Sequence, residues 1–278
     1  MLATDPLLAG LVDDAAVFPP GNAPMADALA EHLRYRAAPW SAAIGPFLCP
    51  ASRIDELRAR LPADATLRLS LVVDVPGDDA HAALRACAAD DGLTLAGVEA
   101  SLAKLGDDAE TVGANLSRLA GALGWLEVPQ TGFDTALDLI RTSGWHGAKY
   151  RTGGVTADAF PSEVELAELL AACAGRQLPF KLTAGLHHAV RSTTAEGFEA
   201  HGVLNVLVAT RVAATGGSVA EVAAVLAERR PEPLVGFTAG WDDGIRTGVR
   251  ESFRSFGCCG VTDPLDDLAD LGLLEGYR

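Results

Sequence analysis

The chain has 278 residues, of which 49% are hydrophobic and 21% charged, a composition typical of a folded globular protein. Its formal net charge of −15 at pH 7 repels the phosphates of nucleic acids and anionic lipids. No apolar run approaches the roughly 20 residues that a membrane span requires, and the N-terminus lacks the pattern of a secretory signal. We therefore expect a cytoplasmic protein that binds a small molecule rather than nucleic acid or membrane.

Short apolar runs alternate with amphipathic segments along the whole chain, which predicts alternating strands and helices. Eight strands are predicted near residues 10–18, 42–49, 67–75, 93–100, 124–128, 147–151, 179–184 and 253–257. Helices are predicted near residues 25–35, 52–61, 80–89, 109–123, 133–143, 162–174 and 204–214, with a last one from residue 263. A repeat of about 35 residues with buried strands favours one α/β domain over residues 1–278, a (β/α)8 TIM-type barrel. The alternative is an open doubly wound sheet.

The segment 216–245 fits this repeat least well, and we predict it to be an irregular insertion before the last strand. Within it, residues 218–230 have the pattern of an extra helix. Residues 233–239 have the composition of either a strand or a loop.

Lysine is rare in this chain, because only three of the 22 basic side chains are lysines. Two of them lie inside buried strands: Lys149 in the sixth predicted strand and Lys181 in the seventh. Side chains alternate along a strand, so Lys149 shares a face with Arg151, and Lys181 shares one with Thr183. If these faces point inward, both amines meet near the mouth of the barrel, where barrel enzymes have their active sites.

Two neighbouring, partly buried amines disfavour each other's charge, so we expect at least one of the two lysines to have a lowered pKa. A neutral amine is a nucleophile that can form a Schiff base with a carbonyl substrate. The alternative is an anion clamp, in which both lysines, Arg151 and Arg191 bind a phosphate or carboxylate.

The two lysine strands resemble those of a known enzyme family. Residues 149–154 (KYRTGG) and 180–185 (FKLTAG) are similar to the two lysine strands of the deoxyribose-phosphate aldolases, and the resemblance covers residues 147–191. It implies an aldolase-type barrel in which Lys149 forms the Schiff base and Lys181 lowers its pKa. The acidic strand motif of that family has only a loose match in residues 72–75, and its phosphate-binding turn has no clean counterpart, so the resemblance does not imply a phosphosugar substrate.

Several carboxylates are candidates for the proton relay that a Schiff-base reaction requires. Glu99 and Glu127 lie in apolar strands, where an unpaired charge is unfavourable, so we expect them to meet the lysines or an arginine in a catalytic or a structural ion pair. Asp13 and Asp14 follow the first apolar run, and only one of the two can point into the barrel. Asp14 is the catalytic candidate, and Asp13 a substrate-binding one.

His187 and His188 follow the seventh predicted strand, in the loop where barrels hold substrates. We expect them to act as acid, base or hydrogen-bond donor. With Asp13, Glu99 or Glu127 they could also form a metal site, but no HxH or HExxH spacing is present, so we predict no metal ligands and no cofactor.

Five cysteines without CxxC spacing are predicted to be reduced thiols. The stretch 255–260 (SFGCCG) places a thiol at the barrel mouth if it ends the eighth strand, although a buried, inert cysteine is the favoured interpretation.

These patterns favour an aldolase-like lyase that acts on a small carbonyl or sugar-like substrate, and they allow a homo-oligomer. An isomerase or hydrolase, with or without a metal, that binds an anionic substrate remains the alternative, as does a catalytically inactive ligand-binding barrel.

Overall fold

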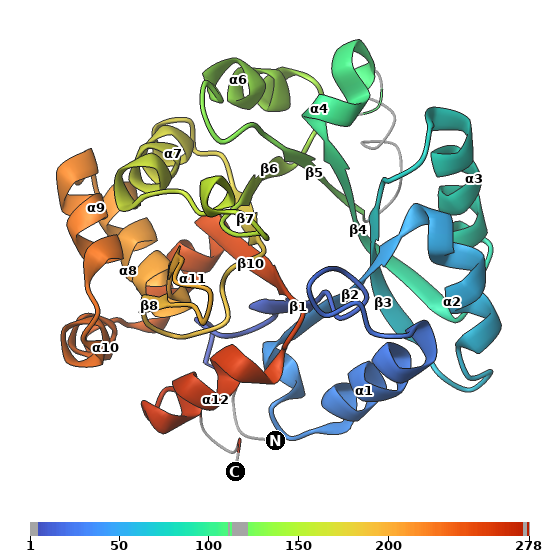
Figure 1. Ribbon diagram of the computed structural model, residues 1–278, viewed down its shortest axis with the longest axis horizontal. Coiled ribbons are helices and arrows are strands. Elements are labelled where there is room, and N and C mark those ends of the chain that lie inside the picture. The colour runs from blue at the N-terminus through green and yellow to red at the C-terminus, as the bar shows by residue number, and fades with distance from the viewer. Residues whose placement is uncertain (1–4, 111, 113–121, 275–276, 278) are drawn as a thin grey trace.

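The computed structural model describes residues 5–110, 112, 122–274 and 277 and contains a closed barrel of eight parallel strands. The strand order is β1-β10-β7-β6-β5-β4-β3-β2, so the first and last strands pair and close the barrel (Figure 1). The strands are β1 Val12–Asp14, β2 Ile44–Pro50, β3 Leu67–Val72, β4 Leu93–Ser101, β5 Leu123–Glu127, β6 Gly147–Arg151, β7 Phe180–Thr183 and β10 Phe253–Cys258. The prediction of a (β/α)8 barrel is confirmed.

Helices surround the strands on the outside of the barrel (Figure 1). They are α1 Met25–Ala37, α2 Ile54–Arg60, α3 Gly77–Ala88, α4 Leu102–Leu105, α6 Asp134–Thr142, α7 Glu163–Gly175, α8 Val203–Ala214, α9 Val219–Ala227, α10 Pro231–Ala239, α11 Asp243–Ser252 and α12 Thr262–Asp270. Short 3-10 turns occupy Ser41–Ala43, Ala51–Arg53, Gly106–Asp108 and Ala157–Ala159, and the strands β8 Ser192–Thr193 and β9 Glu199–Ala200 form a small hairpin. Most of the helix expected over 109–123 lies outside the described residues.

In the connection from β7 to β10, the helix predicted near 204–214 is present as α8 and the extra helix predicted over 218–230 as α9, but the segment 216–245 as a whole is helical and not an irregular insertion. The segment 216–245 contains α9, α10 and the start of α11. The helix α9 begins with a capping box, in which Ser218 and Glu221 bond each other's backbone N–H groups. Residues 233–239 form neither a strand nor a loop, because Pro231 lies in the first turn of α10, where the fixed φ of proline favours a helix start.

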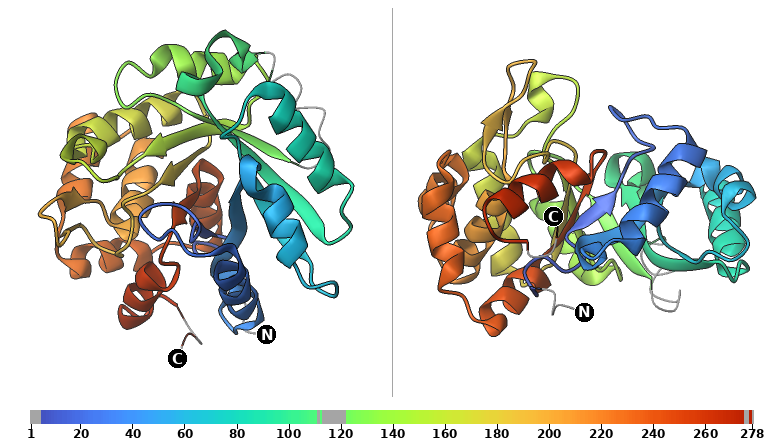
Figure 2. Two further views of the ribbon diagram at one scale, coloured as in Figure 1. Left: turned by 45° about the vertical axis from the view of Figure 1, so that its right-hand side comes forward. Right: turned by 90° about the horizontal axis from the view of Figure 1, so that it is seen from below.

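The first strand is shorter than the predicted 10–18. After Asp14 the chain leaves the barrel, and the Asp14 carboxylate accepts a hydrogen bond from the Ala16 N–H at 3.0 Å. The segment that follows and the segment after β7 project on the same side of the barrel, as the right-hand view of Figure 2 shows. Both therefore lie at the carboxyl ends of the strands.

Two sets of side chains alternate along β6 and β7. Tyr150 and Leu182 are fully buried and belong to the apolar core cluster that also contains residues from the surrounding helices. Lys149 and Lys181, one position earlier on each strand, point into the barrel and meet acidic side chains there. The polar chemistry is thus enclosed by an apolar shell.

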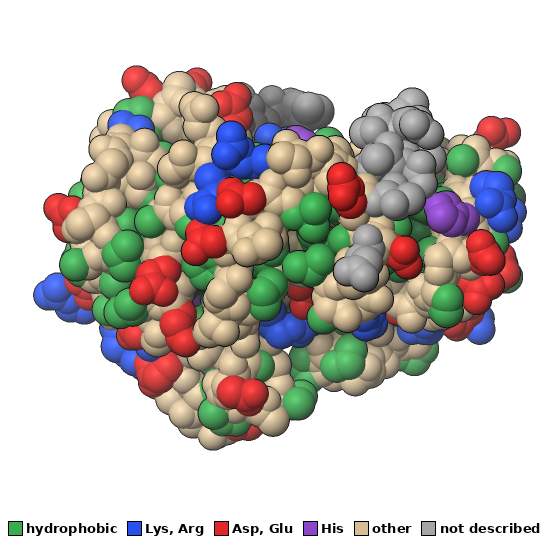
Figure 3. All heavy atoms as spheres, turned by 90° about the horizontal axis from the view of Figure 1, so that it is seen from above, with side chains coloured by type: hydrophobic (Ala, Val, Ile, Leu, Met, Phe, Trp, Pro, Cys, Tyr) green, Lys and Arg blue, Asp and Glu red, His purple; other side chains and the backbone are tan. Residues whose placement is uncertain are grey.

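Basic and acidic side chains are interspersed over the face of the molecule seen in Figure 3. None of the helices in the described part of the chain is long and apolar enough to cross a membrane.

Candidate active site in the barrel interior

The two strand lysines are joined by one carboxylate. Lys149 and Lys181 are register partners on the paired strands β6 and β7. Glu99, on β4, contacts both amines: its Oε2 forms an ion pair with Lys149 Nζ at 3.1 Å, and its Oε1 accepts a hydrogen bond from Lys181 Nζ. The amines are therefore brought together as predicted from strand alternation, but with a negative charge between them.

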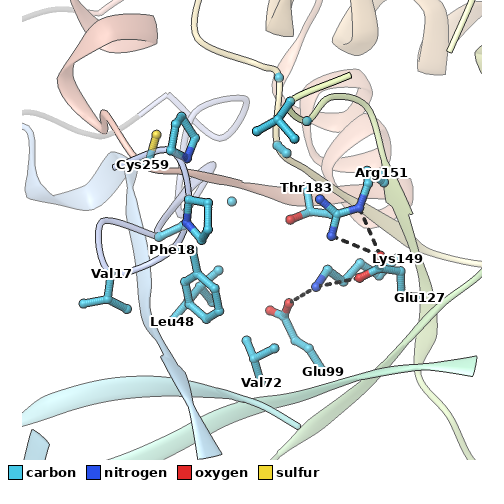
Figure 4. A pocket seen from close by; sticks show the side chains of 18 of the residues that line it. Val17, Phe18, Leu48, Val72, Glu99, Glu127, Lys149, Arg151, Thr183 and Cys259 are labelled. Carbon is cyan, nitrogen blue, oxygen red and sulfur yellow. Dashed lines mark hydrogen bonds and ion pairs between the residues drawn. The ribbon is translucent and has the colours of Figure 1, made fainter. Parts of the chain in front are cut away.

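Lys149 contacts a second carboxylate, that of Glu127. Glu127 Oε2 lies 3.1 Å from Lys149 Nζ, and Glu127 Oε1 lies 3.3 Å from Arg151 Nη2. Burial alone would raise the pKa of Glu127, but the charges of Lys149 and Arg151 hold it below its ordinary value. Figure 4 shows Glu99 and Glu127 both directed at the amine of Lys149.

On the side of Lys181, the partners are fully enclosed. Asp13 Oδ2 lies 2.7 Å from Lys181 Nζ and also accepts a hydrogen bond of 2.7 Å from the Ser255 hydroxyl. Ser70 donates to Glu99 Oε1 at 3.0 Å. Neither serine was anticipated from the sequence, although Ser255 has the inward parity of β10.

Lys181 does not have the lowered pKa that the sequence predicts for at least one of the two lysines. Burial opposes the charge of this amine, but Asp13 and Glu99 more than offset that effect, so its pKa is raised. Like-charge repulsion between the lysines does not dominate because Glu99 separates them. The Lys181 amine is therefore held in its charged form by Asp13 and Glu99.

The carboxyls that share these lysines differ in how readily they take up a proton. Burial would raise the pKa of Glu99, but Lys181 and Lys149 lower it to about 2. Burial raises the pKa of Asp13, and the nearby charge of Glu99 acts in the same direction, although Lys181 opposes both. Asp13 therefore accepts a proton more readily than Glu99 does.

A cavity of about 830 Å³ opens above Lys149 at the carboxyl ends of the strands. Its polar lining includes Glu99, Glu127, Lys149, Arg151, Thr183, His187 and His188. The side chains of Phe18, Leu48 and Val72 form an apolar wall facing this polar group (Figure 4). The cavity thus combines one amine, its carboxylates and apolar surface.

Lys181 and Asp13 line a different cavity, of about 580 Å³, at the amino ends of the strands. They are not among the residues that line the larger cavity. Asp13, a predicted substrate-binding residue, therefore reaches a ligand of the larger cavity only through Lys181 and Glu99.

Asp14, predicted to be catalytic, points away from the barrel interior. Its Oδ2 lies 2.9 Å from Nδ1 of His32 on α1, and both side chains are buried. Since adjacent residues of a strand face opposite sides, the inward position of Asp13 forces Asp14 toward the helix layer. The expectation that Asp14 belongs to the site is wrong, and its carboxylate connects β1 to α1 instead.

The two histidines bond residues of α12 that the sequence did not connect with them. His187 Nδ1 lies 3.2 Å from Asp263 Oδ2, and His188 Nδ1 lies 3.0 Å from Asp267 Oδ2. The spacing of Asp263 and Asp267, one helical turn apart, is the only signal of this contact in the sequence. Among the described residues, no group of three or more His, Cys, Asp or Glu side chains is placed to hold a metal ion, so the proposed set with Asp13, Glu99 or Glu127 does not assemble.

All five cysteines are free, as predicted. Cys258 is buried, but Cys259 is partly exposed and lines the larger cavity. The favoured interpretation of a buried cysteine is therefore wrong for Cys259, because the chain turns at the end of β10 and the second thiol lines the cavity.

Comparison of the chain with protein-family models, curated proteins and solved structures gave no significant match. What the site can do follows from its geometry. An amine that closes one end of a cavity and contacts two carboxylates can give up a proton and attack an electrophilic carbon.

Proposed function

We propose that this protein is a lyase of the aldolase type that acts on a small carbonyl compound through a Schiff base on Lys149. The observation that carries the proposal is the position of Lys149, a residue that is only 6% exposed and lines a cavity of about 830 Å³. Its amine lies 3.1 Å from both Glu99 and Glu127. The likeness of residues 147–191 to the deoxyribose-phosphate aldolases supports the same assignment.

The carboxylates supply the proton transfers that the reaction requires. Lys149 gives a proton to Glu127, and its nitrogen attacks the carbonyl carbon. Glu127 returns this proton to the hydroxyl group of the adduct, which leaves as water, so that an iminium and the Glu127 carboxylate remain. A carboxylate, Glu127, then takes the proton of the substrate hydroxyl one carbon further along. The C–C bond breaks, its electrons move to the iminium nitrogen, and an aldehyde leaves. Protonation of the enamine carbon and hydrolysis release the second product and restore Lys149.

The charge balance of the site disfavours an anion clamp. Lys149 already contacts two carboxylates, and Arg151 contacts Glu127. Binding a phosphate here would place a further negative charge next to Glu99 and Glu127. A carbonyl substrate with hydroxyl groups avoids this repulsion and can bond the same carboxylates.

Borohydride trapping tests the proposal. We would incubate the protein with glyceraldehyde, dihydroxyacetone or pyruvate, reduce with borohydride and map the modified peptide by mass spectrometry. We expect one adduct on Lys149, absent in Lys149→Met and retained in Lys104→Met. Lys104 is a matched control because it is an exposed lysine that lines the same cavity.

The chain contains only three lysines, so the mapping is unambiguous. Modification confined to Lys104 or the N-terminal amine would contradict the proposal. Binding of the same compounds without any adduct would favour an inactive ligand-binding barrel instead.

A further inference from the structure

A thiol, an imidazole and a carboxylate lie in line at the mouth of the larger cavity, away from the lysine cluster. Cys259 Sγ lies 3.8 Å from His187 Nε2, and the other ring nitrogen, Nδ1, lies 3.2 Å from Asp263 Oδ2. The three residues come from the end of β10, the loop after β7 and the first turn of α12. Cys259 and His187 both line the cavity.

The turn between β10 and α12 explains why these groups meet. The Asp263 N–H donates to the Gly260 carbonyl at 3.2 Å, which folds the chain back after the two cysteines. A Cβ atom at Gly260 would collide with the Asp263 carboxylate. Gly260 therefore allows Asp263 to reach over the turn to His187.

The loop after β1 closes on Cys259 from the other side. A Cβ atom at Gly21 would lie 2.9 Å from Cys259 Cβ, so only glycine allows this approach. The backbone N–H of Gly21 also bonds the sulfur and favours its charged form.

The surroundings select Cys259 rather than Cys258 as the anionic thiol. Burial would raise the pKa of Cys259, but hydrogen bonds from His187 and Gly21 bring it below its ordinary value. Burial raises the pKa of Cys258, whose thiol donates to the Gly260 carbonyl at 3.1 Å. Hydrogen bonds to the two thiols raise the pKa of His187 and favour the imidazolium.

His188 does not compete for this pair, and Cys258 contacts the other ring nitrogen: its Sγ lies 3.6 Å from His187 Nδ1 and not from the Nε2 that faces Cys259. His188 bonds Asp267 at 3.0 Å, one turn further along α12, and is more exposed than His187.

We propose that Cys259 is a second catalytic nucleophile of the cavity, activated by His187 and oriented through Asp263, and that it accepts the acyl group of a small ester or thioester. The order of thiol, imidazole and carboxylate is that of acyl-transfer triads, which are recognised by geometry and not by chain order. The apolar residues Val17 and Phe18 line the same part of the cavity and suit a short apolar acyl chain (Figure 4).

The reaction balances without any further reagent except water. The thiolate attacks the acyl carbon, and collapse of the adduct expels the leaving alkoxide or thiolate, which takes a proton from His187. Water then attacks the thioester and gives a proton to His187. The carboxylic acid leaves, and the thiolate and imidazolium are restored.

The 4-nitrophenyl esters of acetate and butyrate are suitable probes. With the full chain we expect a burst of one nitrophenolate per protein and one acyl group on the peptide that contains Cys259. Cys259→Ser should abolish the burst, whereas Cys87→Ala, the control, should retain it, because Cys87 is a buried free thiol that does not line the cavity. Lys149→Met should also retain it, which separates this proposal from the Schiff-base lyase.

The pH dependence of Cys259 alkylation by iodoacetamide distinguishes an activated thiolate from an ordinary exposed thiol. We expect its midpoint below the usual thiol value of about 8.5 and a rise toward that value in His187→Gln. Asp263→Asn and Gly260→Ala, which act on the orientation of His187, should shift the midpoint in the same direction by less. Acylation of Cys258 or Lys149 instead, or a midpoint that His187→Gln leaves unchanged, would overturn the proposal.

Discussion

Lys149 and Lys181 occupy paired positions on neighbouring strands, but their surroundings give them different chemistry. Both contact Glu99. Lys149 opens into the larger cavity and has Glu127 as its second partner, whereas Lys181 is enclosed with Asp13 and lines the cavity at the opposite end of the barrel. Identical side chains in register thus differ in their second carboxylate partner and in the cavity that they line.

The comparison shows that one lysine of the pair can hold a carboxylate in place while the other faces the cavity. The ion pairs of Lys181 fix Glu99, and Glu99 in turn fixes the Lys149 amine. Asp13, Lys181, Glu99 and Lys149 are all buried, so removing one of these side chains leaves the charge of its partner without compensation. Substitutions around Lys181 should therefore lower the stability of the fold, whereas substitutions around Lys149 should lower the activity.

The largest effect is expected for Lys181→Met, which leaves Asp13 and Glu99 buried with one fewer cation. We expect the free energy of unfolding to fall by about 3–5 kcal/mol. Lys149→Met should cost less, because Glu99 keeps Lys181 and Glu127 keeps Arg151. Urea denaturation of the two variants measures the difference, and equal losses would mean that the two lysines have the same structural role.

A second effect is expected on chemistry alone. Glu127→Gln keeps the shape of the side chain but removes the base, so exchange of substrate α-protons with deuterated water should slow by about 100-fold or more. The carbonyl compound that is trapped on Lys149 serves as substrate, and proton NMR follows the exchange. Glu196→Gln, which changes an exposed carboxylate in the lining of the same cavity, is the control and should exchange at the normal rate.

The result separates two roles of Glu127. A slow exchange, together with an adduct on Lys149 that still forms on long incubation with borohydride, indicates proton transfer by this carboxylate. Normal exchange in Glu127→Gln would show that its contact with Lys149 and Arg151 is structural only.

A substitution of Asp14 tests whether this residue lies outside the active site. Asp14→Asn weakens a buried hydrogen bond to His32, and we expect a loss of about 1–3 kcal/mol in unfolding free energy. Trapping on Lys149 should not change, because the Asp14 carboxylate faces α1. A loss of trapping at unchanged stability would return Asp14 to the catalytic group.

The fold was largely predictable because each buried parallel strand is a short apolar run with clear ends. Residues 233–239 were not, since the helix there depends on where Pro231 falls in the first turn. Strand alternation also predicted that Lys149 and Lys181 share the barrel interior. Strand alternation does not show which of two adjacent acids faces inward. The sequence analysis favours Asp14 as the catalytic residue, whereas Asp13 is the residue that faces the barrel interior.

The contacts between residues that are far apart in the sequence could not be predicted from the sequence pattern of either segment. Glu99 and Lys181 are far apart in the chain, and Lys181 has a raised pKa only because Glu99 and Asp13 reach it. Asp263 is likewise separated from His187 by several helices, and only the turn at Gly260 brings it close. Pairing of this kind is a property of the closed barrel and not of either segment.

The smallest expected effect concerns the acid limb of stability and the two carboxyls that share Lys181. The lowered pKa of Glu99, about 2, stabilises the fold above its ordinary pKa of 4.5, and this contribution is lost as pH falls toward 2. The raised pKa of Asp13 acts in the opposite direction: the folded state takes up this proton before the unfolded state does, so protonation of Asp13 favours folding as pH falls toward its ordinary value of 3.8.

Asp13→Asn removes only the contribution of Asp13. In urea denaturation between about pH 7 and pH 4, the variant should therefore lose stability more steeply than the wild type, whereas the other carboxyls contribute equally to both. Parallel curves would mean that Lys181 and Ser255 hold Asp13 ionised as firmly as Glu99, and that the enclosed region does not distinguish its two acids.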